Sequence, residues 1–189
     1  PNEPGDVDSE NMYKVYALAQ KYKAPILMHI DFQKRPEWVE QFWRVATDFP
    51  EVKFIVAHYC RAASGKSPEL ELCSKTLDKF PNVFTDVSMG GGIKRYMRYF
   101  DENPEIFRNF ILRYQDRIMW GTDIEIEPGA KKDAEWIERR MRLDFLILSR
   151  ASYKNPFNSD DTQTHKGLNL PRKVLKKIYL ENPRKILQL

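Results

Sequence analysis

The sequence is poor in cysteine and histidine, and it has no long apolar run. Its two cysteines, Cys60 and Cys73, are too few for a disulfide framework or a zinc ribbon, so a reducing, cytoplasmic location is expected. No run approaches membrane-spanning length. The net charge is only +4, and the basic residues are mixed with acids apart from short clusters such as 139–142. Such helical clusters are usually solvated faces, so neither nucleic acid nor a membrane is expected as a partner.

The chain also lacks an initiator methionine and opens at Pro1 in a polar stretch that leads directly into a predicted helix. We therefore expect the sequence to be part of a longer protein. Its 189 residues are enough for one domain with a real core, so residues 1–189 are interpreted as a single domain.

Short apolar runs rich in branched residues alternate with stretches of helical spacing. The runs predict strands at 25–30, 52–58, 83–88 and 118–122, and the intervening stretches predict helices at 8–22, 36–49, 67–80 and 103–114. Two helix-to-strand junctions, 49–52 and 80–83, nearly repeat one another as Phe-Pro-Glu-Val and Phe-Pro-Asn-Val. They lie 31 residues apart (80 − 49), about one βα unit. The pattern predicts an α/β fold with four parallel strands, half the number in a TIM barrel.

Less regular segments follow the third and fourth strands. A loop is expected after Gly90-Gly91-Gly92, a long helix over 132–148 and a polar loop over 152–167. His165 lies in that polar loop, and no role is expected for it. A helix from Pro171 through Leu180 and a last short helix that starts at Asn182-Pro183 close the chain.

Three potential metal ligands, His29, His58 and Asp123, stand at the ends of predicted strands. Taken singly, each has a structural explanation, as a hydrogen-bonded histidine or a turn-capping aspartate. The carboxyl ends of parallel strands, however, share one edge of the sheet, where such folds keep their active sites. The joint pattern therefore favours a metal-centred hydrolytic or lyase site.

Five segments, ILMHI, FIVAHYC, NVFTDVS, IMWGTDI and the ending KIYLENPRKIL, together resemble the amidohydrolase superfamily. The branch resembled also contains aminocarboxymuconate-semialdehyde decarboxylase, and the segments follow the order of its last four barrel strands and final helix. The resemblance implies that this chain is the C-terminal half, βα units 5–8, of a (β/α)8 barrel. It implies that His29 is a metal ligand and that Asp123 is both a ligand and a proton acceptor. His58 is implied either to bind a second metal or to polarise the substrate and shuttle protons.

The family's His-x-His pair on its first strand has no counterpart in this chain. Two implied ligands, His29 and Asp123, are fewer than the three or four that zinc requires. Either an N-terminal half of the parent protein supplies the others, or the chain is an inactive remnant that binds a small molecule or another protein. Half a barrel also leaves strand edges and inward faces without partners, so its own N-terminal half or a second copy is the expected protein partner.

The resemblance implies a divalent metal, with zinc expected, and hydrolysis of a C–N, C–O or ester bond of a small molecule by metal-activated water. Decarboxylation of a small unsaturated acid is the alternative reaction. Tyr59 and Arg61 are expected to line the loop above His58 and to contact the substrate. Arg61 is expected either to grip a substrate carboxylate or to pair with a neighbouring acid on the surface.

Overall fold

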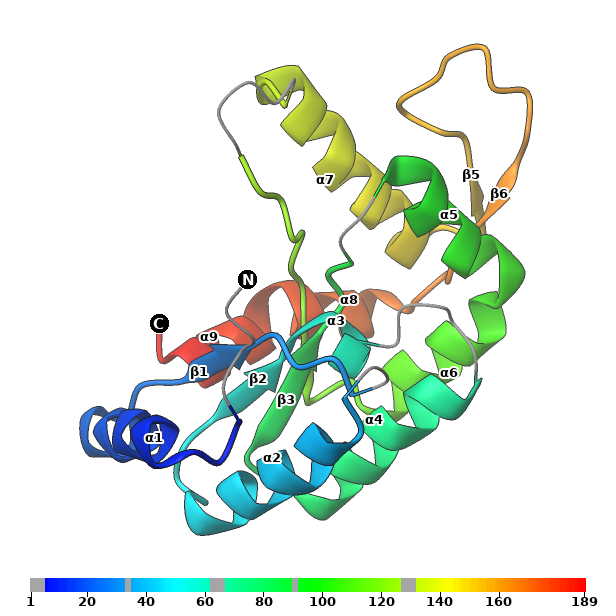
Figure 1. Ribbon diagram of the computed structural model, residues 1–189. Coiled ribbons are helices and arrows are strands. Elements are labelled where there is room, and N and C mark those ends of the chain that lie inside the picture. The colour runs from blue at the N-terminus through cyan, green and yellow to red at the C-terminus, as the bar shows by residue number, and fades with distance from the viewer. Residues whose placement is uncertain (1–5, 33–34, 62–66, 90–91, 127–131) are drawn as a thin grey trace.

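The computed structural model describes residues 6–32, 35–61, 67–89, 92–126 and 132–189. Its centre is a parallel sheet in the order β1-β2-β3-β4, as predicted (Figure 1). The strands are β1 (Ile26–Met28), β2 (Phe54–Val56), β3 (Val83–Asp86) and β4 (Ile118–Met119). Ile26 pairs with Phe54, and Phe54 pairs with Val83, so the first three strands begin in step. Their carboxyl ends therefore lie together at one edge.

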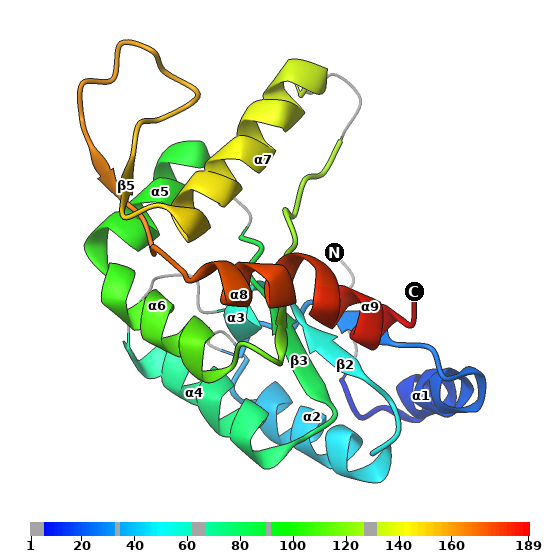
Figure 2. The same ribbon diagram turned by 180° about the vertical axis from the view of Figure 1, so that it is seen from behind.

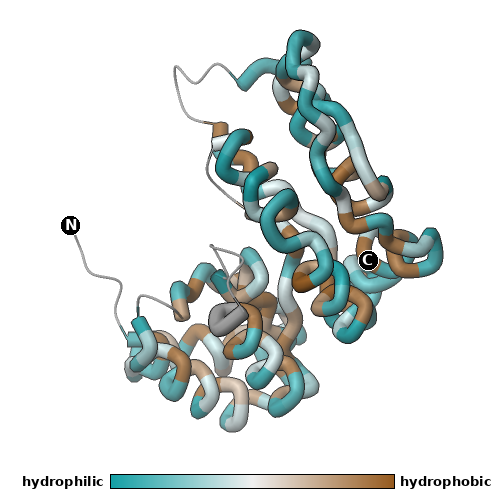
Figure 3. The backbone as a smooth tube through the Cα atoms, turned by 90° about the vertical axis from the view of Figure 1, so that its right-hand side faces the viewer, coloured by the Kyte–Doolittle hydropathy of each residue, from teal (hydrophilic) through white to brown (hydrophobic). Residues whose placement is uncertain are grey.

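Four helices lie where the apolar spacing predicts them and cover one face of the sheet (Figure 1). They are α1 (Glu10–Tyr22), α2 (Glu37–Asp48), α4 (Ser67–Lys79) and α6 (Pro104–Arg113). The main core forms between this helical layer and strand residues such as Phe54, Val83 and Ile118, all fully buried. In Figure 3 the hydrophilic positions lie mainly along the outer sides of the helices.

The two repeated junctions are structurally linked. α2 and α4 each end two residues before the proline, at Asp48 and Lys79. The Asn82 side-chain amide, from the second junction, donates to the carbonyl oxygens of Ala46, Phe49 and Val52 at 3.0–3.2 Å. One repeat therefore satisfies backbone acceptors of the other, which fixes the spacing of two βα units.

The opposite face of the sheet is covered by the C-terminal segment of the same chain. This segment consists of α8 (Arg172–Lys176), a π-helical turn η1 (Lys177–Glu181) and α9 (Asn182–Leu187), which cross the strands in Figure 2. Ile186 packs on the inward-facing Ile55, Phe84 and Met119. The expectation that all four inward faces lack packing is therefore wrong for β2, β3 and β4. Leu27 on β1 remains 66% exposed.

Two elements differ from the prediction. Helix α5 (Ile93–Glu102) occupies a stretch expected as loop, because Tyr96, Met97 and Phe100 form a buried face. The expected polar loop closes as a hairpin of β5 (Ser152–Tyr153) and β6 (His165–Lys166). Together with α7 (Ala134–Ser149), these elements project beyond the carboxyl edge of the sheet in Figure 1. They build the walls above that edge.

The short segment α3 (Ala57–Arg61) is a left-handed turn. His58, Tyr59, Cys60 and Arg61 have φ values of 62°, 53°, 55° and 66°. Left-handed backbone costs about 1–2 kcal/mol for each residue other than glycine, so the surrounding contacts must hold this turn in place.

One of those contacts is a disulfide between Cys60 and Cys73 of α4, with the two Cα atoms 5.4 Å apart. The cytoplasmic expectation treated these cysteines as reduced, and their pairing removes that support because stable disulfides are rare in the cytosol. The turn brings the thiols together, which their spacing in the sequence does not indicate. Across the described residues, no helix is both long and apolar enough to cross a membrane.

Candidate active site

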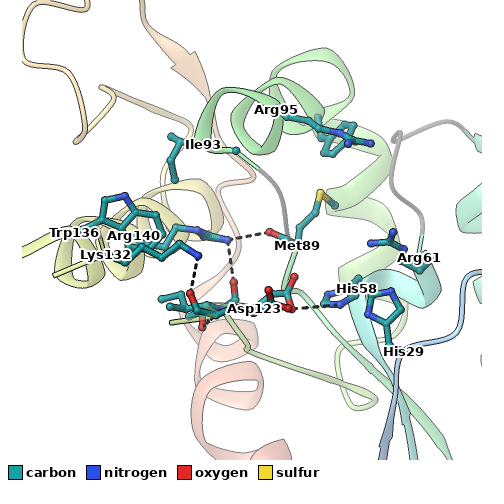
Figure 4. A pocket seen from close by; sticks show the side chains of 15 residues that line it. His29, His58, Arg61, Met89, Ile93, Arg95, Asp123, Lys132, Trp136 and Arg140 are labelled. Atoms are coloured by element: carbon teal, nitrogen blue, oxygen red, sulfur yellow. Dashed lines mark hydrogen bonds and ion pairs between the residues drawn. The ribbon is translucent and has the colours of Figure 1, made fainter. Parts of the chain in front are cut away.

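A cavity of about 730 Å³ opens at the carboxyl edge of the sheet, below α5 and α7 (Figure 4). His29 follows β1, His58 follows β2 and Asp123 follows β4, and all three side chains line this cavity. The structure therefore brings the three predicted ligands together at the expected edge. Asp123 itself lies in the left-handed region, with φ of 54°, a conformation that aspartate adopts more readily than most residues.

Two residues at the end of β3, Asp86 and Ser88, fix His58 by hydrogen bonds. Its backbone N–H donates to Asp86 Oδ1 at 3.0 Å, and the Ser88 hydroxyl donates to the same oxygen at 2.5 Å. The His58 Nδ1 atom lies 2.8 Å from Ser88 Oγ and 3.3 Å from the Ser88 carbonyl oxygen. A carbonyl oxygen can only accept, and the hydroxyl proton is engaged with Asp86, so Nδ1 carries the proton. In the neutral ring, the other nitrogen, Nε2, then has a free lone pair.

That lone pair faces the cavity. His58 Nε2 lies 3.7 Å from Asp123 Oδ1, which is beyond hydrogen-bonding distance (Figure 4). The His29 ring lies edge-on to the His58 ring, with centroids 4.9 Å apart. The two imidazoles and the carboxylate thus lie close together without forming hydrogen bonds to one another. Their lone pairs remain available to a bound ion or molecule.

The electrostatics keep His29 neutral. Burial lowers the pKa of His29, and the positive charge of Arg61 lowers it further. Arg61 lines the cavity, and its Nε donates to Asp31 Oδ2 at 3.3 Å. Arg61 therefore pairs with a neighbouring acid, as one expectation had it, and it also lines the cavity, whereas its contact with a substrate stays a prediction.

Tyr59 does not lie where it was expected. Its side chain is fully buried, away from the cavity, and packs against Phe107 and Phe110 of α6 at centroid distances of 5.3 and 6.0 Å. The left-handed turn directs successive side chains to different sides, so Tyr59 enters the core while His58 faces the cavity. The prediction that Tyr59 lines the substrate site is wrong.

Arg140 also lines the cavity, although its place in a basic cluster predicts a solvated side chain. Arg140 is 4% exposed, forms an ion pair with the buried Asp144, and lies 4.1 Å over the ring of Tyr96. It donates to the carbonyl oxygens of Met89 and Thr122 at 3.2 Å. These bonds connect α7 to the segments that follow β3 and β4. Burial raises the pKa of Asp144 to about 6, although Arg140 opposes the shift. The apolar spacing of α7 was the available signal, since Arg140 lies three residues before the buried Leu143.

The donor set fits a divalent metal in kind but is incomplete in number. Imidazole nitrogen and carboxylate oxygen are ordinary zinc ligands, and His58 Nε2 presents the form of imidazole that binds metal. Among the residues that the structure describes, however, no group of three or more His, Cys, Asp or Glu side chains is placed to hold one ion. Any complete site would need ligands from outside these residues.

The sequence model of the amidohydrolase family matches residues 1–189. The chain belongs to the amidohydrolase family. A search of curated proteins found no match. Solved structures agree with the fold: a TIM-barrel protein of Bordetella bronchiseptica is 19% identical with a TM-score of 0.59, over 98% of this chain and 53% of that one.

Two further solved structures show the same fold. A putative 2-pyrone-4,6-dicarboxylic acid hydrolase of Pseudomonas putida is 12% identical with a TM-score of 0.60, over 99% of this chain and 60% of that one. A Burkholderia multivorans amidohydrolase with bound Zn is 11% identical with a TM-score of 0.56, over 97% of this chain and 59% of that one. The chain thus has the parallel α/β fold of TIM-barrel amidohydrolases and spans little more than half the length of these proteins.

Proposed function

We propose that this chain supplies strands 5–8 of a metal-dependent hydrolase barrel that cleaves a C–N, C–O or ester bond of a small molecule. One observation carries the proposal. His58 Nε2, the ring nitrogen turned away from Ser88, faces the Asp123 carboxylate across 3.7 Å, beside His29, inside a cavity at the carboxyl edge of the sheet. This is the edge at which barrel enzymes keep their catalytic groups.

His29 and Asp123 are the residues that would hold the metal. The lowered pKa of His29 keeps its ring neutral and able to ligate near pH 7. Zinc is the proposed ion, supported by the nitrogen and oxygen donors and by the zinc bound to the solved Burkholderia protein. When bound, a divalent metal polarises the substrate carbonyl and lowers the pKa of water.

Side chains of this chain carry out the remaining steps. Asp123 accepts the proton that the attacking water loses, and its exposed carboxylate lies within the cavity to do so. His58 Nε2 exchanges a proton with the reacting group, because it is the free nitrogen of a ring whose Nδ1–H is fixed on Ser88. Arg61 stands beside both histidines and contributes positive charge at that end of the cavity.

The rest of the barrel is proposed to come from outside residues 1–189. Within the described residues the parallel sheet has four strands, whereas a closed barrel of this class has eight. The outer edge of β1 has no strand partner in the described part of the chain. A preceding N-terminal half, or a second copy, would pair there, and the N-terminal half would bring the missing metal ligands.

The test is turnover by the full-length protein. Purified protein should hydrolyse at least one member of a panel of small esters, lactones and amides, and chelation should abolish the activity. Asp123→Ala should lower kcat by about 100-fold or more, because general-base catalysis is worth about 10²–10⁴. Asp116→Ala is the matched control, since Asp116 is an exposed carboxylate paired with Lys177, and it should retain full activity. Equal kcat for the Asp123 variant and the wild type, at saturating metal, would rule the proposal out.

A further inference from the structure

The guanidinium of Arg140 connects the two segments that follow β3 and β4. Its Nη2 atom donates to the carbonyl oxygen of Met89, after β3, and to that of Thr122, after β4, both at 3.2 Å (Figure 4). One nitrogen thus satisfies a backbone acceptor in each segment. Either segment can move away from the other only if one of these hydrogen bonds lengthens.

These two segments carry the reacting groups of the candidate active site. Met89 directly follows Ser88, which fixes the His58 ring, and Thr122 directly precedes Asp123. The Nε2 atom of His58 and the Oδ1 atom of Asp123 face one another across 3.7 Å. The two carbonyl groups that Arg140 bridges therefore belong to the sequence neighbours of residues that determine this separation.

Two contacts guide the backbone that leads to Asp123. Gly121 lies so close to Ser88 that a Cβ atom added to the glycine would meet the Ser88 Cβ at 3.3 Å. Arg140 then holds the carbonyl group of Thr122. Asp123 itself has a left-handed backbone, with φ of 54°, which is unfavourable without support from neighbouring contacts. The placement of its carboxylate thus depends on residues outside its own segment.

Arg140 is itself fixed on helix α7. Its Nη1 atom pairs with Asp144 of the same helix, and its guanidinium lies 4.1 Å from the centroid of the Tyr96 ring. All three residues are buried, so water competes little for these contacts. The forked guanidinium allows one nitrogen to face Asp144 while the other bridges the two carbonyl oxygens.

We propose that Arg140 is a positioning residue, whose bridge sets the separation of His58 Nε2 and Asp123 Oδ1. The inference rests on the proposed hydrolase function and adds to it a residue that acts through these two. Reacting groups must be placed accurately, because a displacement of about 1 Å can lower a rate by about 100-fold. A helix beyond the edge of the sheet would thereby control the geometry of groups that follow two different strands.

A double replacement separates positioning from stability. Removal of Arg140 alone leaves Asp144 buried without its partner, whereas replacing both members of a buried ion pair by apolar residues is often neutral or stabilising. Full-length protein with Arg140→Met and Asp144→Leu should therefore unfold at a urea concentration close to that of the wild type.

The same double variant should nevertheless lose activity. Its kcat on a substrate from the panel of esters, lactones and amides should fall by about tenfold or more, with KM nearly unchanged, because the misplaced groups act in the transition state. Crystal structures of the two proteins should show a longer separation between His58 Nε2 and Asp123 Oδ1 in the variant.

The ion pair of Glu135 and Arg139 provides the matched control. It has the same spacing on the same helix, but both side chains are exposed and neither lines this cavity. Arg139→Met with Glu135→Leu should leave both kcat and the His58–Asp123 separation at the wild-type values. Arg140→Lys is the second test variant, because lysine keeps a positive charge beside Asp144 but lacks the fork that also reaches both carbonyl oxygens. It should show the same loss of kcat and the same longer separation.

Wild-type kcat in the folded double variant and in Arg140→Lys would overturn the inference, since the role of Arg140 would then be confined to stability. An unchanged separation of His58 and Asp123 in the crystal structures of these variants would overturn it as well. The crystal structures give this answer even if the wild type hydrolyses no member of the panel, so failure of the hydrolase proposal is a distinct result. Conversely, an unchanged separation would leave the outcome for Asp123→Ala intact.

Discussion

The Nδ1–H of His58 donates to the Ser88 hydroxyl at 2.8 Å, and this contact decides which ring nitrogen faces the cavity. Asp86 completes the support by accepting from the Ser88 hydroxyl and from the His58 backbone. A buried residue outside the cavity lining thus sets which ring nitrogen of a cavity-lining histidine carries the proton. Partners of this kind orient catalytic and metal-binding histidines in many enzymes.

Ser88→Ala should lower kcat about 10- to 100-fold while leaving the fold and the metal content close to wild type. Without the hydroxyl, only the longer contact to the Ser88 carbonyl oxygen, at 3.3 Å, remains to hold the proton on Nδ1. Nitrogen-15 spectra of the histidines should show His58 protonated on Nδ1 in the wild type and as a mixture of tautomers in the variant. Ser149→Ala is the control, because Ser149 is exposed on α7 and bonds only to its own helix. An unchanged tautomer in the Ser88 variant would contradict this role.

Arg140 and its neighbour Arg139 should differ sharply in their effect on stability. Arg140→Ala should lower the free energy of unfolding by about 3–5 kcal/mol, because it leaves Asp144 buried without its partner. Arg139→Ala removes an exposed pair with Glu135 and should cost at most about 1 kcal/mol. Urea denaturation of the two variants provides the comparison. Equal losses would show that the Arg140 pair is not sequestered from water.

Stability should fall with rising pH because of His165. Its Nδ1 lies 2.7 Å from Asp101 and its Nε2 lies 3.1 Å from Asp161, so both nitrogens carry protons. Burial alone would lower the pKa of His165, but the hydrogen bonds to the two carboxylates outweigh burial and raise it. A raised pKa stabilises the fold fully below the unfolded value of about 6.5. That stabilisation is lost as pH rises through the folded pKa.

His165→Asn should flatten this dependence. Unfolding free energies measured from pH 6 upward should decline in the wild type and decline less in the variant. Proton NMR titration of the His165 ring provides a direct check on the raised pKa. The same slope in both proteins would assign the pH dependence to other groups.

The 189-residue chain by itself should associate. Leu27 is largely exposed and the outer edge of β1 is unpaired within the described residues, and open edges recruit further strands. The packing of Ile186 on the inward face reduces the apolar area that is exposed to water, but it leaves this edge unpaired. Sedimentation equilibrium should show a dimer or larger species at micromolar concentration. A cooperative, monodisperse monomer would count against the missing-half proposal.

The sequence was most informative about elements with a local signal. The four strands were predicted because each is a short branched-apolar run, and their order followed from the intervening helices. The convergence of His29 and Asp123 followed from strand ends sharing an edge. Helix α5 was missed even though Tyr96, Met97 and Phe100 have helical spacing, because three glycines before it suggested a loop.

Other features depend on contacts distant in the sequence. No glycine marks the left-handed turn at 58–61, and tertiary packing holds it there. The burial of Tyr59 and the pairing of Cys60 with Cys73 both depend on that turn. The burial of Arg140 likewise depends on Asp144 and on strand loops far from α7. Composition and spacing carry no record of these partners.

Metal content of the full-length protein tests the central proposal most directly. Elemental analysis by mass spectrometry should find a stoichiometric divalent metal, zinc being expected, in the wild type and in Asp116→Ala. His29→Ala and Asp123→Ala should lose most of it, whereas His58→Ala should retain more metal than activity if His58 moves protons. Wild-type metal content in both the His29 and Asp123 variants, or hydrolysis that survives complete removal of metal, would contradict the account.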